Sequence, residues 1–126
     1  MIGRAMLHLQ TLGLAEVADK LAGDLSFGQQ RLVEVARALF SQPKILFLDE
    51  PGAGLSAGEK ATLMGILRET KQCQDQYIVL TDHSMDFIMT ICDFITVMNF
   101  GRKIFEGTPE EIQKNAEVID AYLGKE

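Results

Sequence analysis

The sequence is poor in positive charge, in cysteine and in long apolar runs. Lysine and arginine number 12 against 18 aspartate and glutamate residues, giving a net charge of −6. Because binding to nucleic-acid phosphates needs clustered positive charge, this balance argues against nucleic acid as a partner. The apolar run at residues 45–48 is far shorter than the roughly 20 residues of a membrane span, and the N-terminus lacks the apolar core of a signal peptide. Cys73 and Cys92 stand in no metal-binding spacing, which predicts two reduced thiols. These absences predict a soluble, intracellular domain.

The 126 residues, 47% of them hydrophobic and 24% charged, suit one globular domain with an α/β fold. Capping-box patterns at Ser26–Gln29 and at Ser56–Glu59 predict the starts of two helices. The first expected elements are a helical segment at 4–21 interrupted at Gly13, a helix from Ser26 stopped by Pro43 and a strand at 45–48. A helix from Ser56 to about Gln72, a strand at 77–80 and a helix capped by Ser84 and ending near Cys92 are expected next. The last expected elements are a hairpin with Gly101-Arg102 between its strands, a helix from Thr108-Pro109 and a tail helix at 117–123 ended by Gly124.

The two short strands are apolar at every position, which predicts parallel strands buried on both faces. In such sheets the chemistry lies beyond the carboxyl ends of the strands. Asp49-Glu50 follows the first strand and Asp82-His83 follows the second. Both pairs are therefore expected at one edge of the sheet.

Adjacent carboxylates at the end of a buried strand are costly without a cation. Asp49 is a candidate ligand of Mg²⁺, and Glu50 is a candidate general base for phosphoryl transfer. His83 is a candidate donor to a γ-phosphate or a candidate to orient the attacking water, although a lone histidine is more often a structural hydrogen-bonding residue. The alternative is an Asp-Glu pair that caps the turn before Pro51, and the pattern alone favours neither interpretation.

Ser26, Gly28 and Gln29 lie at the predicted start of a helix, where free N–H groups and partial positive charge suit a phosphate. Gly28 would let an anion approach the backbone closely. An ordinary capped helix explains the same residues and is the commoner case. The glycine-rich residues 52–60 do not form a phosphate-binding loop, because Glu59 separates Gly58 from Lys60.

The order of these motifs resembles the ATP-binding cassette (ABC) ATPases. The resemblance rests on LSFGQQR at 25–31, ILFLDEP at 45–51, AGLS at 53–56 and His83, which are similar to the family's signature, Walker B strand, D-loop and switch histidine. The D-loop and the residues at 105–112 and 118–124 look like those of branched-chain amino acid importers. Ser56 stands where the D-loop usually has Asp or Asn, and Asp82 and Ser84 flank the histidine where importers more often have Glu and Asp.

The resemblance implies a P-loop-NTPase-like layered core. It also implies that Asp49 organises Mg²⁺, that Glu50 is the general base and that His83 contacts the γ-phosphate of ATP. The residues expected to bind nucleotide, mainly that of a second cassette, are Leu25, Ser26, Phe27, Gly28, Gln29 and Ser56.

The Walker A strand, loop and helix of a complete cassette lie upstream of the signature, and only 24 residues precede Leu25 here. The chain is therefore expected to be the C-terminal half of a cassette, to expose apolar surface, and to be inactive and prone to aggregate alone. Three parts are expected: a helical-subdomain remnant at 1–42, the second half of the ATPase core at 43–107 and a helical tail at 108–126.

The function expected from the resemblance is ATP hydrolysis in an ABC transporter that imports branched-chain amino acids. The expected partners are a second cassette, identical or different, and integral membrane permease subunits. The permease would hold the chain on the inner face of the cell membrane. Two alternatives stay open: a non-catalytic partner that complements another cassette, and an ABC ATPase with a task other than transport.

Overall fold

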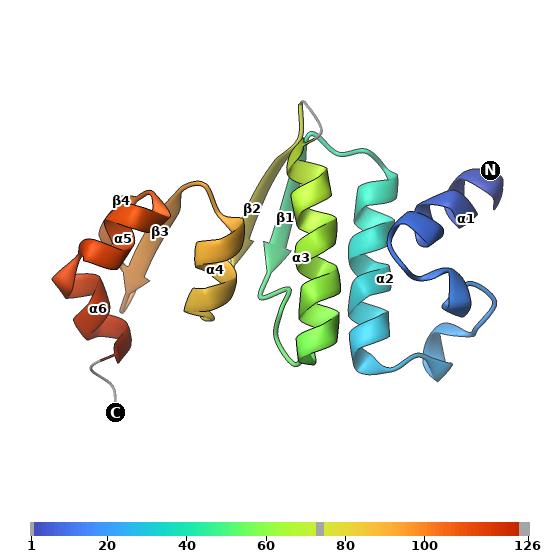
Figure 1. Cartoon of the computed structure of the whole chain (residues 1–126), viewed down its shortest axis with the longest axis horizontal. Coiled ribbons are helices and arrows are strands. Elements are labelled where there is room, and N and C mark those ends of the chain that lie inside the picture. The colour runs from blue at the N-terminus through green and yellow to red at the C-terminus, as the bar shows by residue number, and fades with distance from the viewer. Residues whose placement is uncertain (1, 73–74, 124–126) are drawn as a thin grey trace. The chain divides into compact units, whose positions relative to one another are not determined.

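The computed structural model describes residues 2–72 and 75–123, in two compact units that divide between His83 and Ser84. Figure 1 shows the elements along the chain. The first unit holds α1 (Ile2–Thr11), the short 3-10 helices η1 (Ala15–Val17) and η2 (Ala22–Asp24), α2 (Phe27–Phe40), β1 (Ile45–Asp49), α3 (Ala57–Gln72) and β2 (Tyr77–Thr81). The second holds α4 (Met85–Ile91), β3 (Ile95–Asn99), β4 (Arg102–Gly107), α5 (Pro109–Lys114) and α6 (Ala116–Leu123). None of the helices in the described ranges has the length and apolar character that a membrane crossing requires.

Helices α2 and α3 begin where their capping residues predict. The Ser26 hydroxyl accepts the Gln29 N–H at 3.2 Å, and the Gln29 side chain accepts the Ser26 N–H at 3.1 Å. Ser56 and Glu59 make the same reciprocal pair at the start of α3. Each pair satisfies two backbone donors that a helix start leaves free, so both starts are fixed locally by sequence.

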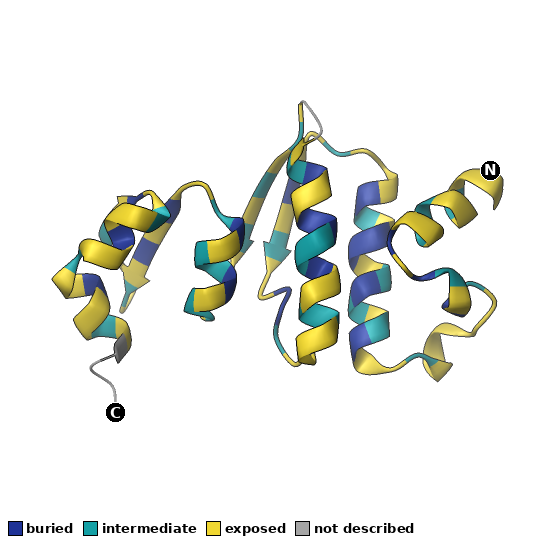
Figure 2. Ribbon diagram, viewed as in Figure 1, coloured by how far each residue is buried: buried dark blue, intermediate teal, exposed yellow. Residues whose placement is uncertain are grey.

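Strands β1 and β2 pair in parallel, as predicted, with Asp49 opposite Thr81 at their carboxyl ends. The expectation that both faces are buried is wrong for the described residues. The side chains of one face are half to three-quarters exposed: Ile45 51%, Phe47 73%, Tyr77 69% and Val79 51%. Leu46, on the other face, is 6% exposed. The period-two alternation of burial shows that only one face is covered (Figure 2).

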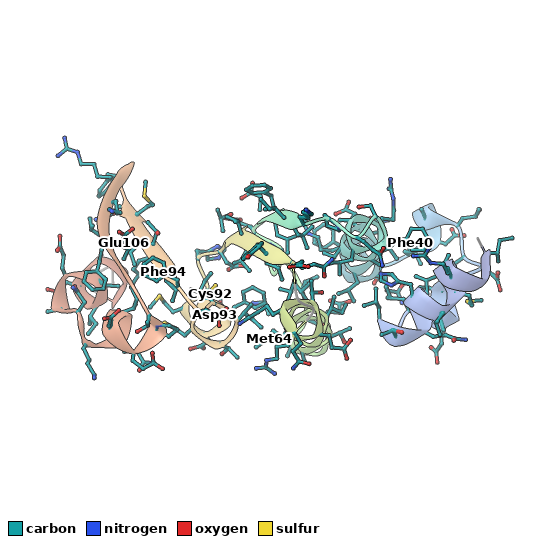
Figure 3. All side chains as sticks on the ribbon, turned by 90° about the horizontal axis from the view of Figure 1, so that it is seen from above. Phe40, Met64, Cys92, Asp93, Phe94 and Glu106 are labelled. Atoms are coloured by element: carbon teal, nitrogen blue, oxygen red, sulfur yellow. The ribbon has the colours of Figure 1, made fainter. Side chains whose placement is uncertain are left out.

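The covered face packs against the helices of the first unit. Figure 3 shows α3 on one side of the two strands, while side chains on the other side project away from it. Leu63 and Leu67 of α3 are completely buried, and Leu32 and Val35 of α2 are nearly so. The apolar stripes of the two helices thus form the core of this unit, and the sheet contributes one face to it.

The second unit has a hairpin with its own buried cluster. Ile95, Val97, Ile112 and Val118 pack together, with residues of α4 and β4 against them. The hairpin was predicted, but its turn residues are Phe100 and Gly101 rather than Gly101 and Arg102, because Asn99 pairs with Arg102. Phe100 and Gly101 both have positive φ, as a two-residue hairpin turn requires.

The remaining helices start near their expected positions. Thr108 and Glu111 form the reciprocal cap of α5, with Pro109 at its first position. Ser84 is at the N-cap position of α4 but makes no side-chain cap hydrogen bond there, which corrects the expected capping role. Cys73 and Gly124 lie outside the described residues, so the two reduced thiols and the end of the tail helix stay predictions. The three-part division of the chain also stays a prediction.

Candidate functional site

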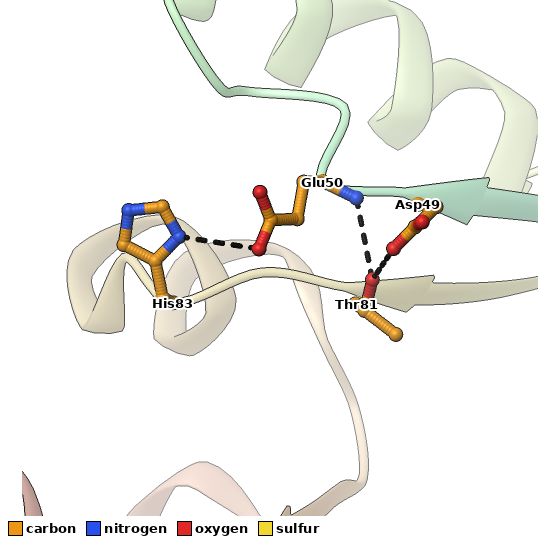
Figure 4. A network of polar contacts seen from close by, with 4 residues as sticks. All are labelled: Asp49, Glu50, Thr81 and His83. Carbon is orange, nitrogen blue, oxygen red and sulfur yellow. Dashed lines mark hydrogen bonds and ion pairs between the residues drawn. The ribbon is translucent and has the colours of Figure 1, made fainter.

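The carboxyl ends of β1 and β2 bring three predicted residues together. Asp49 ends β1, Glu50 follows it, and His83 comes two residues after β2. The His83 Nδ1 lies 3.6 Å from Glu50 Oε1, and the two side chains point toward each other (Figure 4). Both are more than half exposed, so a ligand has access to this edge from solvent. In Figure 1 the N-terminal ends of α2 and α3 lie on the same side of the first unit as these strand ends.

Thr81 joins the two carboxylate residues and was not predicted from the sequence. Its hydroxyl donates to Asp49 Oδ1 at 2.5 Å. The Glu50 N–H donates both to the Thr81 hydroxyl at 3.2 Å and to the Thr81 carbonyl oxygen at 2.9 Å. Only the strand register, Asp49 opposite Thr81, reveals this contact, because 32 positions separate the two residues in sequence.

The residues of the signature segment, 25–29, surround the start of α2. Ser26 and Phe27 are exposed, Leu25 and Gln29 are half-buried and Gly28 is buried. Ser26 and Gln29 are engaged with each other in the capping box. Ser26 and Phe27 therefore face solvent, whereas Gly28 in the same turn is covered.

Two glycines let the signature segment and the residues after Glu50 interlock. A Cβ on Gly28 would overlap the carboxylate of Glu59, and a Cβ on Gly54 would lie 2.9 Å from the ring of Phe27. The Glu59 side chain therefore fills the space over Gly28 of the signature segment, and the Phe27 side chain of that segment fills the space over Gly54. The side of Gly28 on which a Cβ would stand is thus taken by a carboxylate of the same chain. Sequence reasoning found the Glu59 cap but not this contact.

The contact between Gly28 and Glu59 predicts that Gly28→Ala lowers the free energy of unfolding in the natural chain but raises it when Glu59 is replaced by alanine. Gly28→Ala in the natural chain displaces the Glu59 carboxylate and breaks its bond to the Ser56 N–H, a loss of about 1 kcal/mol in the free energy of unfolding. In a Glu59→Ala background the new methyl group has room, and alanine gains about 0.5–1 kcal/mol over glycine in a helix. Urea denaturation of the four variants measures the difference.

Gly65→Ala is the matched control for this cycle. Gly65 lies within α3, and no atom stands within 4 Å of the place its Cβ would occupy. This substitution is expected to stabilise the chain equally in both backgrounds. A Gly28→Ala effect of the same sign and size in both backgrounds would contradict the proposed contact with Glu59.

The residues at the strand ends fit a magnesium ion held partly by a nucleotide. Magnesium prefers carboxylate oxygens and is commonly held by one or two carboxylates together with phosphates and waters. Asp49 is exposed, and Thr81 fixes one of its two oxygens. Within the described ranges no three acidic, histidine or cysteine side chains gather into a metal cluster. A site of this kind would therefore be completed by ligand phosphates.

Two family models and several known proteins match the sequence. A family model described as ABC transporter matches residues 3–53, and one described as branched-chain amino acid ATP-binding cassette transporter matches residues 102–126. The high-affinity branched-chain amino acid transport ATP-binding protein LivG of Salmonella typhimurium is 43% identical over 124 residues, 98% of this chain and 49% of that protein. The corresponding protein BraF of Pseudomonas aeruginosa is 41% identical over 117 residues, 93% of this chain and 46% of that protein.

A solved ATP-binding cassette of an ABC transporter, in its ADP conformation, matches the fold. It superposes with a TM-score of 0.82 at 30% identity, over 98% of this chain and 50% of that chain. The chain thus spans about half the length of the relatives it matches. Its motifs, its parallel strand pair and these similarities together establish that the chain belongs to the ATP-binding cassette ATPases, as a partial P-loop-NTPase-like domain resembling the ATP-binding subunits of branched-chain amino acid importers.

Proposed function

We propose that the chain provides the catalytic carboxylate, the switch histidine and the signature segment of an ATPase subunit that drives import of branched-chain amino acids. The observation that carries the proposal is the placement of Asp49, Glu50 and His83 at one sheet edge. The proposed transported substrate is that of the relatives, which are branched-chain amino acid transport ATP-binding proteins.

Glu50 and His83 divide the work at the γ-phosphate of ATP. The Glu50 carboxylate accepts a proton from the attacking water, because a general base must lie within hydrogen-bond reach of that water. His83 contacts the γ-phosphate and helps to orient the water. The 3.6 Å separation between Glu50 Oε1 and His83 Nδ1 supports a shared ligand position for the two groups.

Asp49 is the residue that would hold Mg²⁺, directly or through water. When bound, the ion neutralises the charge that develops on the phosphate oxygens. Asp49 keeps its orientation through the hydroxyl of Thr81. In this proposal Asp49 is therefore held in one orientation before a ligand arrives.

The signature segment acts on the nucleotide of a second cassette. The surface that would close on the γ-phosphate side of that nucleotide is formed by Ser26, Gly28 and Gln29, together with Leu25, Phe27 and Ser56. The exposure of Ser26 and Phe27 supports this role. Closure of two cassettes on ATP, and their opening after hydrolysis, would move membrane permease subunits that hold the pair at the cytoplasmic face of the membrane.

Catalysis requires residues beyond this chain. The chain matches about half of each relative, and one face of its parallel strands is uncovered among the described residues. The 126 residues by themselves are expected to hydrolyse no ATP. In this proposal residues 1–42 belong to the helical subdomain, 43–107 to the ATPase core and 108–126 to the tail.

A hybrid cassette tests the function. These 126 residues replace the matching stretch of the Salmonella typhimurium LivG protein, and the hybrid is purified for MgATP hydrolysis and returned to cells that lack that protein. We expect hydrolysis by the hybrid and uptake of branched-chain amino acids, neither of which occurs with the chain alone. A folded hybrid that binds ATP without hydrolysing it would refute the catalytic assignment.

That refuting result would favour a second function, a non-catalytic partner. The observation in its favour is the exposed signature segment, which can serve another cassette's nucleotide without any chemistry at Glu50. Mixing the chain with an intact cassette and ATP would then produce a complex detectable by light scattering. Absence of an ATP-dependent complex would exclude this alternative.

A further inference from the structure

One side chain of β2 organises both carboxylate residues at the end of β1. The Thr81 hydroxyl donates to Asp49 Oδ1 at 2.5 Å and accepts the Glu50 N–H at 3.2 Å. A hydroxyl can do both because it has one donor hydrogen and two acceptor lone pairs. Figure 4 shows Thr81 on the neighbouring strand, with its hydroxyl joined to both residues and the Glu50 side chain turned toward His83.

Glu50 needs such support because its backbone is in an unfavourable region. Its φ is +44°, in the left-handed region that side-chain-bearing residues rarely adopt. Residues keep such conformations when surrounding structure determines them, and they gather at functional sites. The Glu50 N–H is held by two acceptors, and both belong to Thr81.

We propose that Thr81 is a positioning residue, whose hydroxyl sets the directions of the Asp49 carboxylate and of the Glu50 side chain. This inference rests on the proposed function, since it assigns Thr81 a role through Asp49 and Glu50. Without the hydroxyl, Asp49 loses its donor and Glu50 keeps only the carbonyl acceptor. The carboxylates can then turn away from the nucleotide position while the strand pair itself remains.

Substitution of Thr81 by valine or by serine distinguishes a positioning role of the hydroxyl from a purely structural role of the side chain. Thr81→Val keeps the shape and the strand preference of the side chain but removes the hydroxyl. Thr81→Ser keeps the hydroxyl and removes a methyl group. Thr81 is exposed, so neither substitution opens a cavity in the core.

The activity test uses the hybrid cassette described above. Thr81→Val is expected to lower kcat about 10-fold, since an error of 1 Å in catalytic geometry costs up to about 100-fold. The KM for ATP is expected to stay within about 2-fold, because this proposal gives Thr81 no direct contact with the nucleotide. Thr81→Ser is expected to retain kcat. In a Glu50→Gln background, Thr81→Val is expected to reduce the residual hydrolysis by less than 10-fold, because only the effect through Asp49 remains.

A second measurement needs no activity. Amide hydrogen exchange at Glu50, measured on the 126-residue chain, is expected to be several-fold faster in Thr81→Val and unchanged in Thr81→Ser, because exchange follows local opening of the hydrogen bond. Equal kcat in the natural sequence and Thr81→Val, or equal losses in Val and Ser, would overturn the proposal. If the natural hybrid hydrolyses no ATP, the proposed function fails, and unchanged exchange in Thr81→Val would separately overturn the role of Thr81.

Discussion

Glu50→Gln is expected to lower MgATP hydrolysis by the hybrid cassette about 100- to 10,000-fold, the range that a positioned general base contributes. Glutamine keeps the size and the hydrogen-bonding geometry of the side chain but cannot accept the proton of the attacking water. ATP binding is expected to persist, because the substitution removes a base and leaves the phosphate contacts in place. Single-turnover hydrolysis and equilibrium ATP binding, measured on the same preparation, separate the two effects.

Glu16→Gln provides the matched control. Glu16 is an exposed carboxylate of the same unit, in η1 and away from the strand ends in sequence. This substitution makes the same change of charge and is expected to leave hydrolysis unaltered. A Glu50→Gln hybrid that still turns over ATP at the natural rate would remove Glu50 from the mechanism.

Phe47→Glu is expected to have opposite consequences in the chain alone and in the hybrid cassette. Phe47 is 73% exposed on the uncovered face of the strand pair. In the 126-residue chain a glutamate there remains in water, and the added charge is expected to reduce self-association. If the other half of the cassette covers this face, the carboxylate becomes buried without a partner, at a cost on the order of 3 kcal/mol or more. Light scattering of the chain and urea denaturation of the hybrid measure the two effects.

Phe100→Glu is the control for this reversal. Phe100 is 89% exposed in the hairpin turn, so the same replacement is expected to leave the urea midpoint of the hybrid unchanged. Equal midpoints for the Phe47→Glu hybrid and the natural hybrid would show that the face of β1 and β2 is not covered in the cassette.

Local features of the fold were predictable because they depend on neighbours in sequence. Three helix starts rest on a hydroxyl residue and a Gln or Glu three positions later, at Ser26, Ser56 and Thr108. The apolar strands and their acidic ends were predictable for the same reason. Strand pairing then brought Asp49, Glu50 and His83 to one edge, as expected for parallel strands.

Features that depend on distant residues were not predictable. An all-apolar strand indicates that both faces suit burial, but it carries no information about what covers each face, and one face of β1 proved exposed. The bond between Thr81 and Asp49 requires the register of two strands. The contact between Glu59 and Gly28 requires the packing of α3 against α2. Each of these belongs to tertiary structure, which periodicity alone does not encode.

The separate buried cluster of the second unit has an evolutionary consequence. Ile95, Val97, Ile112 and Val118 pack with residues that also follow His83 in the chain. The general transporter model matches within the first unit, whereas the model for branched-chain amino acid transporters matches residues 102–126. Mutations that tailor the C-terminal segment to one class of transporter can therefore be absorbed by a core that shares no residues with the carboxylate site.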